Sequence, residues 1–512
     1  MVAAGIFLSR IAGLVRQRVL AHFLGLTDAA DAFAAAFRIP NFLQNLFGEG
    51  VLSASFIPVY ARLEAQGRHQ ESRRVAGAVA GLLGLAVAVL VALGVTTTPW
   101  LVYALAPGFG GAKRALVIQL VRILFPGVGL LVLTAWCMGV LNSHRKFFLS
   151  YVAPVIWNAA IIAATLLPGR GTASETLVLW AAWGAVAGSL LQLGVQLPTV
   201  WRLTAGIPLS IGRGDPNVRT VVGNFLPAFV SRGAVQISAF VDAILASLLP
   251  TGAVAALANA QTLYTLPVSL FGMSVAAAEL PELSAAAAAS DSAYQALRER
   301  LERGMRQVAY FIVPSAVALA ALGQVIAAAL FQTGVFTRAD SFYVWGILAG
   351  SAVGLLASTL GRLYSSAWYA LHDTRTPLRY ALIRVGLTTG LGYVAAIHLP
   401  GLLGLPPAWG AAGLTASAGV AGWVEFLLLR RGLDRRIGVT RLPAGLVARL
   451  WAPALGAAAA GWGVLRWLDG RLGPILTAIL VLAPFGAVYV GGTLLLGVAP
   501  ARELTYRFRR KA

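Results

Sequence analysis

Apolar runs long enough to cross a membrane follow one another along almost the whole chain of 512 residues. Hydrophobic residues make up 58% of the chain and charged residues only 12%, about half the usual share for a globular protein. So few charges are unable to cover the surface of a water-soluble domain of this size. A transmembrane helix needs roughly 20 apolar residues. The sequence therefore predicts an all-α polytopic membrane protein with about 14 transmembrane helices.

Polar residues, glycines and prolines separate the apolar runs and give the approximate bounds of each predicted helix. The predicted spans are 2–24, 29–61, 74–104, 114–141, 147–167, 175–201, 218–249, 252–284, 305–331, 341–370, 377–398, 407–430, 443–467 and 473–498. The first span contains Arg10, Arg16 and Arg18. A cleavable signal would place its charges before an uninterrupted apolar core, so we interpret this span as a membrane helix.

The loops alternate between strongly basic and weakly basic, which predicts the orientation. The chain has 40 Lys plus Arg against 19 Asp plus Glu, a net charge of +21. One set of alternate loops, together with the C-terminal tail, carries most of this excess. The other set carries only Lys113, Arg114, Arg170, Arg338 and Arg471. Because cytoplasmic loops are enriched in Lys and Arg, the first set and both termini are predicted to be cytoplasmic.

Short segments recur in the same order at an offset of about 225 residues. Leu46-Phe47-Gly48 matches Leu270-Phe271-Gly272, and Ser9-Arg10 matches Ser231-Arg232. The repeat spans six helices, an even number, so both copies have the same orientation. The predicted organisation is an N-lobe at 1–210 (helices 1–6), a C-lobe at 211–436 (helices 7–12), and helices 13–14 with a basic cytoplasmic tail at 437–512. Two such lobes favour a transporter that works by alternating access.

Several arginines lie deep within the predicted helices. An arginine at a helix centre costs at least ~2.5–3.5 kcal/mol on insertion scales, unless it faces a polar cavity. Arg16, Arg38, Arg232 and Arg362 lie far from either helix end, and Arg10 is the repeat partner of Arg232. These positions favour a cavity lining. The alternative is a set of structural ion pairs, for which the possible partners are Asp31, Glu49, Asp242 and Glu425.

The second predicted helix is unusually polar. Asp31, Arg38 and Asn45 are spaced by seven residues and share one stripe, and Pro40 is expected to interrupt the helix between them. This helix also carries Asn41, Gln44 and Glu49. The first predicted helix carries Arg10, Arg16 and Gln17. The two helices are predicted to line a hydrophilic, cationic chamber. Such a chamber suits an anionic substrate, because guanidinium binds phosphate in a bidentate manner.

Four N-terminal motifs resemble the MurJ (MviN) family of lipid II flippases, within the multidrug/oligosaccharidyl-lipid/polysaccharide exporter superfamily. They are RIAGLVR at 10–16, TDAADAF at 27–33, FRIPN at 37–41 and LFGEG at 46–50, and the match resumes at 236–281, 331–337 and 373–377. The resemblance implies fourteen helices, two lobes and a lipid-tail groove formed with helices 13 and 14. It also implies lipid II (undecaprenyl-diphosphate-linked disaccharide pentapeptide) as the substrate, moved from the inner to the outer leaflet of the bacterial cytoplasmic membrane.

The resemblance places Arg10 and Arg16 at the family's cavity arginines on helix 1, and Asp31, Arg38 and Glu49 at its charged positions on helix 2. Together with the depth and polarity of the other residues, it gives the candidate functional residues. The substrate-binding candidates are Arg10, Arg16, Arg38 and Arg232. The candidates for gating or polar cavity lining are Gln17, Asp31, Asn41, Gln44, Glu49 and Arg362. The chain departs from the family at Gln17, where many members carry an acid, and at Gln44 and Thr262, where members carry arginine.

The energy source stays open between Na⁺ and the membrane potential. Asp242 matches the Asp of the family's possible cation site, whose other positions, Thr388 and Gly392 here, make that site incomplete. No Walker A motif is present, so ATP is not expected to drive transport. The five histidines have no metal-ligand spacing, and no cofactor is predicted. Membrane lipids are the other expected partners, without nucleic acid, and the protein is expected to be a monomer.

Other functions remain as alternatives. A flippase for another lipid-linked oligosaccharide of the O-antigen type would share the fold. A drug or cation antiporter of the same superfamily would favour an acidic or aromatic chamber. A membrane-embedded polysaccharide polymerase would need a carboxylate or metal constellation that the sequence does not contain, so no enzyme activity is predicted. A non-transporting scaffold would leave the deep arginines without a role.

The orientation is testable by cysteine labelling. A reporter fused after Lys511 should stay cytoplasmic, and cysteines placed near Gly110 or Gly171 should react with a membrane-impermeant reagent from outside. The reason is the concentration of basic residues in the opposite set of loops. External labelling of a cysteine at Gln66 or Arg435 would contradict the fourteen-helix arrangement.

Overall fold

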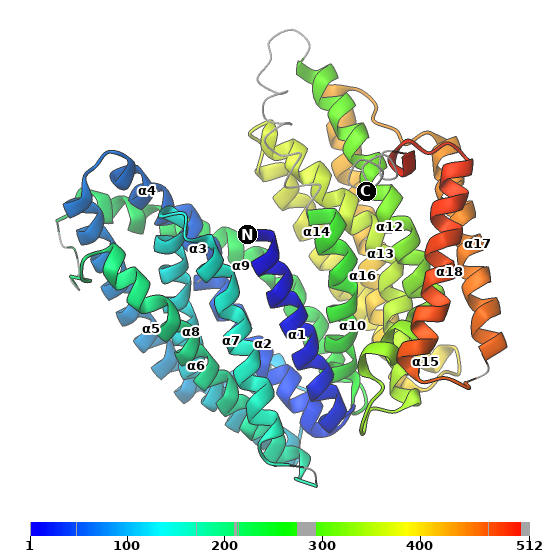
Figure 1. The fold of residues 1–512 in the computed structure, drawn as a ribbon, viewed down its shortest axis with the longest axis horizontal. Helices are drawn as coiled ribbons and strands as arrows, with labels where there is room; N and C mark the ends of the chain where they lie inside the picture. Colours follow the sequence, from blue (N-terminus) through cyan, green and yellow to red (C-terminus); the bar gives the residue numbers. More distant parts are fainter. Residues whose placement is uncertain are drawn as a thin grey trace. The chain divides into compact units, whose positions relative to one another are not determined.

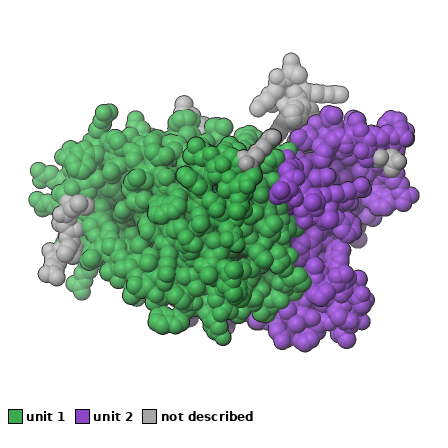
Figure 2. Space-filling view, turned by 90° about the horizontal axis from the view of Figure 1, so that it is seen from below, with its two compact units in different colours: residues 1–255 green, residues 256–512 purple. Residues whose placement is uncertain are grey.

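The structure is a computed structural model, and it describes residues 2–47, 49–169, 171–208, 212, 214–273, 293–468 and 470–502. These residues form helices, turns and connecting loops, with no β-strand among them. Contacts between residues divide the chain into two compact units, Met1–Ala255 and Ala256–Ala512 (Figure 2). The predicted all-α fold class is confirmed.

The first unit is built from long helices joined by short turns (Figure 1). They are α1 (Val2–Leu24), α2 (Asp28–Phe47), α3 (Glu49–Ser55), α4 (Ile57–Ala65), α5 (His69–Leu105), α6 (Gly111–Ser143), α7 (Phe147–Leu166), α8 (Ser174–Leu203) and α9 (Pro216–Ser247). Within this unit α1 packs along α7, α2 along α6, and α8 against both α6 and α7. Helix α9 packs on α3 and α5.

Helix α10 (Ala253–Pro267) begins in the first unit and continues in the second. A short π-helix follows it, η1 (Val268–Met273). The rest of the second unit comprises α12 (Ala293–Phe331), α13 (Arg338–Ala370), α14 (Arg375–Tyr393), η2 (Val394–His398), α15 (Leu399–Leu402), η3 (Pro407–Trp409), α16 (Gly410–Ile437), α17 (Ala444–Leu468) and α18 (Pro474–Leu495).

Ten helical segments in the described part of the chain are long and apolar enough to cross a membrane. The predicted spans outside this set are those that contain α1, α2, α9 and α10. Helices α1, α2 and α9 carry the deep charges, which lower their hydropathy, and α10 has only 15 residues. The charged helices are therefore the ones expected to face a polar interior, and the count of fourteen spans stays a prediction.

One local expectation is wrong. Helix α2 runs without interruption from Asp28 to Phe47, through Pro40. Proline removes a single backbone donor, and the helical hydrogen bonds on both sides of it are sufficient to continue the helix. The second predicted span is divided further along, where α3 gives way to α4 at Phe56, just before Pro58 at the second position of α4.

Glycines let helix backbones approach closely in both units. A Cβ added at Gly354 of α13 would lie 2.4 Å from Cα of Gly419 on α16. A Cβ added at Gly184 of α8 would lie 2.5 Å from Cβ of Ala164 on α7. Contacts this short leave no room for a side chain. Small residues at helix interfaces are the usual means of tight packing inside a membrane, where burial of apolar surface contributes little.

Candidate functional site

Arg16 lies on α1 beside two aromatic rings of the first unit. Its guanidinium carbon Cζ is 5.3 Å from the centroid of the Phe37 ring and 5.2 Å from that of Trp157. Its Nε is buried and has no hydrogen-bond partner in the described part of the chain. Within those residues, then, two π-faces rather than a carboxylate stabilise the positive charge of Arg16.

Arg38 lies on α2, and a carboxylate of α9 acts on its charge. The carboxylate of Asp242 attracts the Arg38 guanidinium electrostatically. Arg38 also lines a cavity of about 360 Å³ inside the first unit, formed otherwise mainly by apolar residues of α5, α6 and α9. The alternative of a charge pair, left open by the sequence, therefore fits Arg38 better than Arg16.

Asp31 is the most completely engaged charge of the first unit. Only 1% of its surface is exposed, and its carboxylate accepts hydrogen bonds from Lys113 Nζ at 2.7 Å, Gly252 N at 2.7 Å and Ala255 N at 2.8 Å. The two backbone donors belong to the turn before α10 and its first residues, so Asp31 caps the N-terminus of α10. A carboxylate there also interacts favourably with the helix dipole.

Asp28 extends this arrangement, which we call the Asp31 cluster: Asp28, Asp31, Lys113, Thr251 and Gly252. Asp28 accepts from Lys113 Nζ at 2.8 Å and from the Thr251 hydroxyl at 2.8 Å. Gly252 has a φ of +92°, and a Cβ there would lie 2.8 Å from the Leu26 carbonyl oxygen. The cluster thus ties the start of α2 to the start of α6 and to the α9–α10 turn, at the end of the unit that the loop charges predict to be external.

The other candidates of the first unit are less informative. Arg10 is exposed on α1, and Gln17 is half-buried one position after Arg16. The side chains of Asn41, Gln44, Glu49 and Arg232 lie outside the described residues. Their predicted roles in substrate binding or cavity lining stay predictions.

A separate group of charges lies in the second unit. Arg384 of α14 donates to Glu425 of α16 at 3.0 Å, which identifies a partner for each. Arg362 of α13 is exposed, and the charges of Arg384 and Glu425 both act on it. The hydroxyl of Tyr264 on α10 bonds to that of Ser358 on α13 at 2.8 Å.

Three residues at these sites were not singled out by the sequence: Phe37, Trp157 and Lys113. Aromatic residues in an apolar helix have the same pattern whether they face lipid or an arginine, so no sequence signal identified the first two. Lys113 was recognised only as an external charge. It is one of the few lysines in an arginine-rich chain, and that was the only available sign of a special role.

Known proteins share both sequence similarity and the fold with this chain. The chain matches the family described as Lipid II flippase MurJ over residues 20–481. It is similar to Lipid II flippase MurJ of Burkholderia cenocepacia, 32% identical, covering 99% of this chain and 97% of that protein. It is also similar to a probable lipid II flippase MurJ of Bdellovibrio bacteriovorus, 32% identical over 96% of this chain and 94% of that protein.

Solved structures share the fold. A lipid II flippase MurJ in an inward closed conformation aligns with a TM-score of 0.79 at 22% identity, covering 98% of this chain and 99% of that chain. An inward-facing multidrug resistance MATE transporter of the MOP superfamily aligns with a TM-score of 0.69 at 16% identity, covering 83% of this chain and 95% of that one.

The Asp31 cluster generates a stability prediction. Asp31→Asn should lower the free energy of unfolding by about 2 kcal/mol or more, because asparagine keeps only one of the two oxygens that accept backbone N–H groups of Gly252 and Ala255, and because it removes the charge partner of the largely buried Lys113. Thermal unfolding of the purified protein measures this loss. The control is Asp340→Asn, which alters a half-buried capping carboxylate at the start of α13. An equal or larger loss in the control variant would contradict the special role of Asp31.

Proposed function

The chain belongs to the lipid II flippase MurJ family, and from this membership we infer that it moves lipid II from the inner to the outer leaflet of the membrane. The family match covers residues 20–481, which include the charged helix α2, and the alignment with the Burkholderia relative covers 99% of this chain. The observation that carries the inference onto this chain's own residues is Arg16. Its guanidinium lies next to two aromatic rings, with no carboxylate at ion-pair distance in the described residues.

The proposed substrate matches that arginine chemically. A diphosphate presents several oxygens, and a guanidinium donates two parallel N–H bonds to such a group. We propose that Arg16 and Arg38 contact the diphosphate, together with Arg10 and Arg232. Gln17, Asn41, Gln44, Glu49 and Arg362 are proposed to line the polar path or to control access to it. Asp31, which is buried in the Asp31 cluster, is proposed to act on access only, by holding the helix ends together. Flipping changes no covalent bond of the substrate, so the residues act by binding and release alone.

The chain is a multi-pass membrane protein of a bacterial flippase family. We propose that it resides in the cytoplasmic membrane with both termini inside, and that it acts as a monomer. The proposed mechanism is alternating access, in which the two lobes expose the bound head group first to one side and then to the other.

The membrane potential is the proposed energy source. A diphosphate carries about two negative charges, and moving them outward across a potential that is negative inside gains ~2.3 kcal/mol per charge per 100 mV, or about 4–5 kcal/mol. The chamber arginines do not cancel this gain, because they stay with the protein. Asp242, which attracts Arg38, is proposed to help reset the empty carrier.

The binding role of the arginines is tested by substitution. Arg16→Ala and Arg38→Ala should each reduce lipid II flipping by about ten- to a hundredfold, because a hydrogen bond to a charged group contributes about 1.5–3 kcal/mol. Arg→Lys at either position should recover only part of the rate, since a lysine lacks the bidentate fork. The measurement is lipid II exposure on the outer leaflet after the native protein is depleted and replaced by each variant.

Arg466→Ala is the matched control. Arg466 lies in the last turn of α17 with its guanidinium 4.8 Å from the Trp462 ring, so it also contacts an aromatic ring but lies close to a helix end. Its loss should leave flipping within about twofold of the native rate. Full complementation by both Arg16→Ala and Arg38→Ala would mean that these arginines are structural. If lipid II accumulated in none of the strains, the flippase function itself would be rejected.

The energy source has its own test. Collapsing the membrane potential should stop lipid II flipping, whereas Asp242→Asn should only slow it, because the charge moved in the proposed mechanism is that of the substrate. Outer-leaflet lipid II is measured after each treatment. Undiminished flipping without a potential, combined with loss of flipping in Asp242→Asn, would make ion coupling the driver instead.

A further inference from the structure

The aromatic contact of Arg16 has a specific shape. The guanidinium carbon lies 5.3 Å from the Phe37 ring centroid and 5.2 Å from that of Trp157, and the two centroids are 5.5 Å apart with planes tilted by 38°. These three distances are nearly equal. A guanidinium sandwiched between two rings would separate their centroids by much more. Arg16 therefore lies on one side of the ring pair, in the angle between the two tilted ring planes. We call this position the aromatic notch.

This notch leaves the N–H groups of Arg16 available. A cation–π contact uses the face of the aromatic ring and the charge of the guanidinium, and it consumes none of the five N–H donors. A carboxylate partner would occupy two of those donors and cancel the charge. For a site that binds and releases an anion, an aromatic partner is thus the better support.

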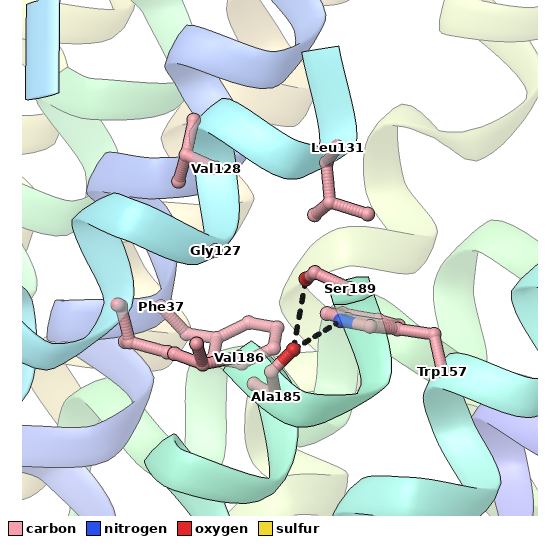
Figure 3. A pocket seen from close by; sticks show the side chains of 9 residues that line it. Phe37, Gly127, Val128, Leu131, Trp157, Ala185, Val186 and Ser189 are labelled. Atoms are coloured by element: carbon pink, nitrogen blue, oxygen red, sulfur yellow. Dashed lines mark hydrogen bonds between the residues drawn. The ribbon is translucent and has the colours of Figure 1, made fainter. Parts of the chain in front are cut away.

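Trp157 is held in place by α8. Its indole Nε1–H donates to the Ala185 carbonyl at 3.0 Å, and that carbonyl also accepts the Ser189 hydroxyl at 2.8 Å (Figure 3). A Cβ at Gly188 would lie 3.0 Å from Trp157 Cδ1, so the glycine provides the space in which the indole lies. The indole has one fixed hydrogen bond and a close-fitting neighbour, and its orientation is defined before any ligand arrives.

The surroundings of the two rings are apolar. Phe37 and Trp157 line a cavity of about 250 Å³ together with residues of α6 and α8, and the only polar side chain in its lining is Ser189, whose hydroxyl bonds to Ala185 (Figure 3). Phe33 extends the aromatic row along α2, with its ring centroid 5.1 Å from that of Phe37. The lining of this cavity contains no charged side chain among the described residues.

We propose that Trp157 and Phe37 are positioning residues for the diphosphate-binding Arg16: they hold its guanidinium in the aromatic notch without a carboxylate or hydrogen-bond partner among the described residues, which leaves its N–H donors for phosphate oxygens. This inference rests on the proposed function, because it assigns the support of one of the proposed substrate-binding arginines. It predicts that the contribution of Trp157 to ligand binding acts entirely through Arg16.

A double-mutant cycle on the full-length protein tests the coupling. The probe is undecaprenyl diphosphate, and its Kd is compared with that of undecaprenol. Trp157→Leu should weaken diphosphate binding about five- to tenfold, as expected for loss of a desolvated cation–π contact. In an Arg16→Ala background the same substitution should change the Kd less than twofold. Trp157→Phe, which keeps a ring and loses the indole hydrogen bond, should restore part of the affinity.

Trp345→Leu is the matched control. Trp345 on α13 also donates its indole N–H to a backbone carbonyl, that of Ala320 at 2.8 Å, and no arginine lies over its ring in the described part of the chain. This substitution removes the same side chain and the same kind of hydrogen bond. It should leave the Kd for undecaprenyl diphosphate within about twofold of the native value.

A second readout does not depend on the lipid. The rate at which phenylglyoxal modifies Arg16, measured on its peptide by mass spectrometry, should rise severalfold in Trp157→Leu and stay unchanged in Trp345→Leu. An equal loss of affinity for Trp157→Leu with and without Arg16, or unchanged modification of Arg16, would overturn the positioning role. A wrong proposed function would give a different result. The native protein would then bind undecaprenyl diphosphate no better than undecaprenol, whereas the modification rate of Arg16 would still rise in Trp157→Leu.

Discussion

A charge inside a membrane protein has to be stabilised by the protein itself, and this constraint organises the described polar interior. Outside water, a guanidinium or carboxylate loses several kcal/mol of solvation, and only a close partner restores it. Arg384 has Glu425 at 3.0 Å, Asp31 has Lys113 at 2.7 Å, and Arg38 is attracted by Asp242. Arg16 has two aromatic rings instead. Charges with a charged partner hold helices together, whereas a charge with aromatic partners stays available to a ligand.

The difference matters for a carrier. A carboxylate that pairs with a binding arginine competes with the substrate, so each binding event has to break an ion pair of the protein. An aromatic notch stabilises the cation less strongly, by ~0.5–2 kcal/mol, but imposes no such competition. Binding to Arg16 therefore starts from a prepared donor, whereas Arg38 has to exchange attraction to Asp242 for attraction to the ligand. In the proposed mechanism Arg16 supplies affinity, and Arg38 links ligand binding to the position of α9.

The sequence predicted the fold class and the polar helices because both depend on composition and spacing. The stripe of Asp31 and Arg38 follows from helical periodicity, and the burial of Asp31 follows from its place in an apolar run. The partners of these residues depend on which helices pack together. Asp31 bonds to residues 82 and 221 positions away, and Trp157 reaches Arg16 from a helix whose sequence contains no charged residue. The continuity of α2 through Pro40 likewise depends on the hydrogen bonds around the proline, which a single residue does not reveal.

The Asp31 cluster also bears on where the chain bends. The predicted lobes are defined by the internal sequence repeat, whereas the compact units are defined by contacts between residues. The two units divide directly after Ala255, the last residue bound by Asp31. Opening the α9–α10 turn would cost the hydrogen bonds of a buried carboxylate, each contributing about 1.5–3 kcal/mol. Beyond Ala255, Pro267 and the π-helix η1 already interrupt the regular helical hydrogen bonds. A rocking motion of the proposed kind therefore costs less if it preserves the Asp31 cluster than if it breaks it.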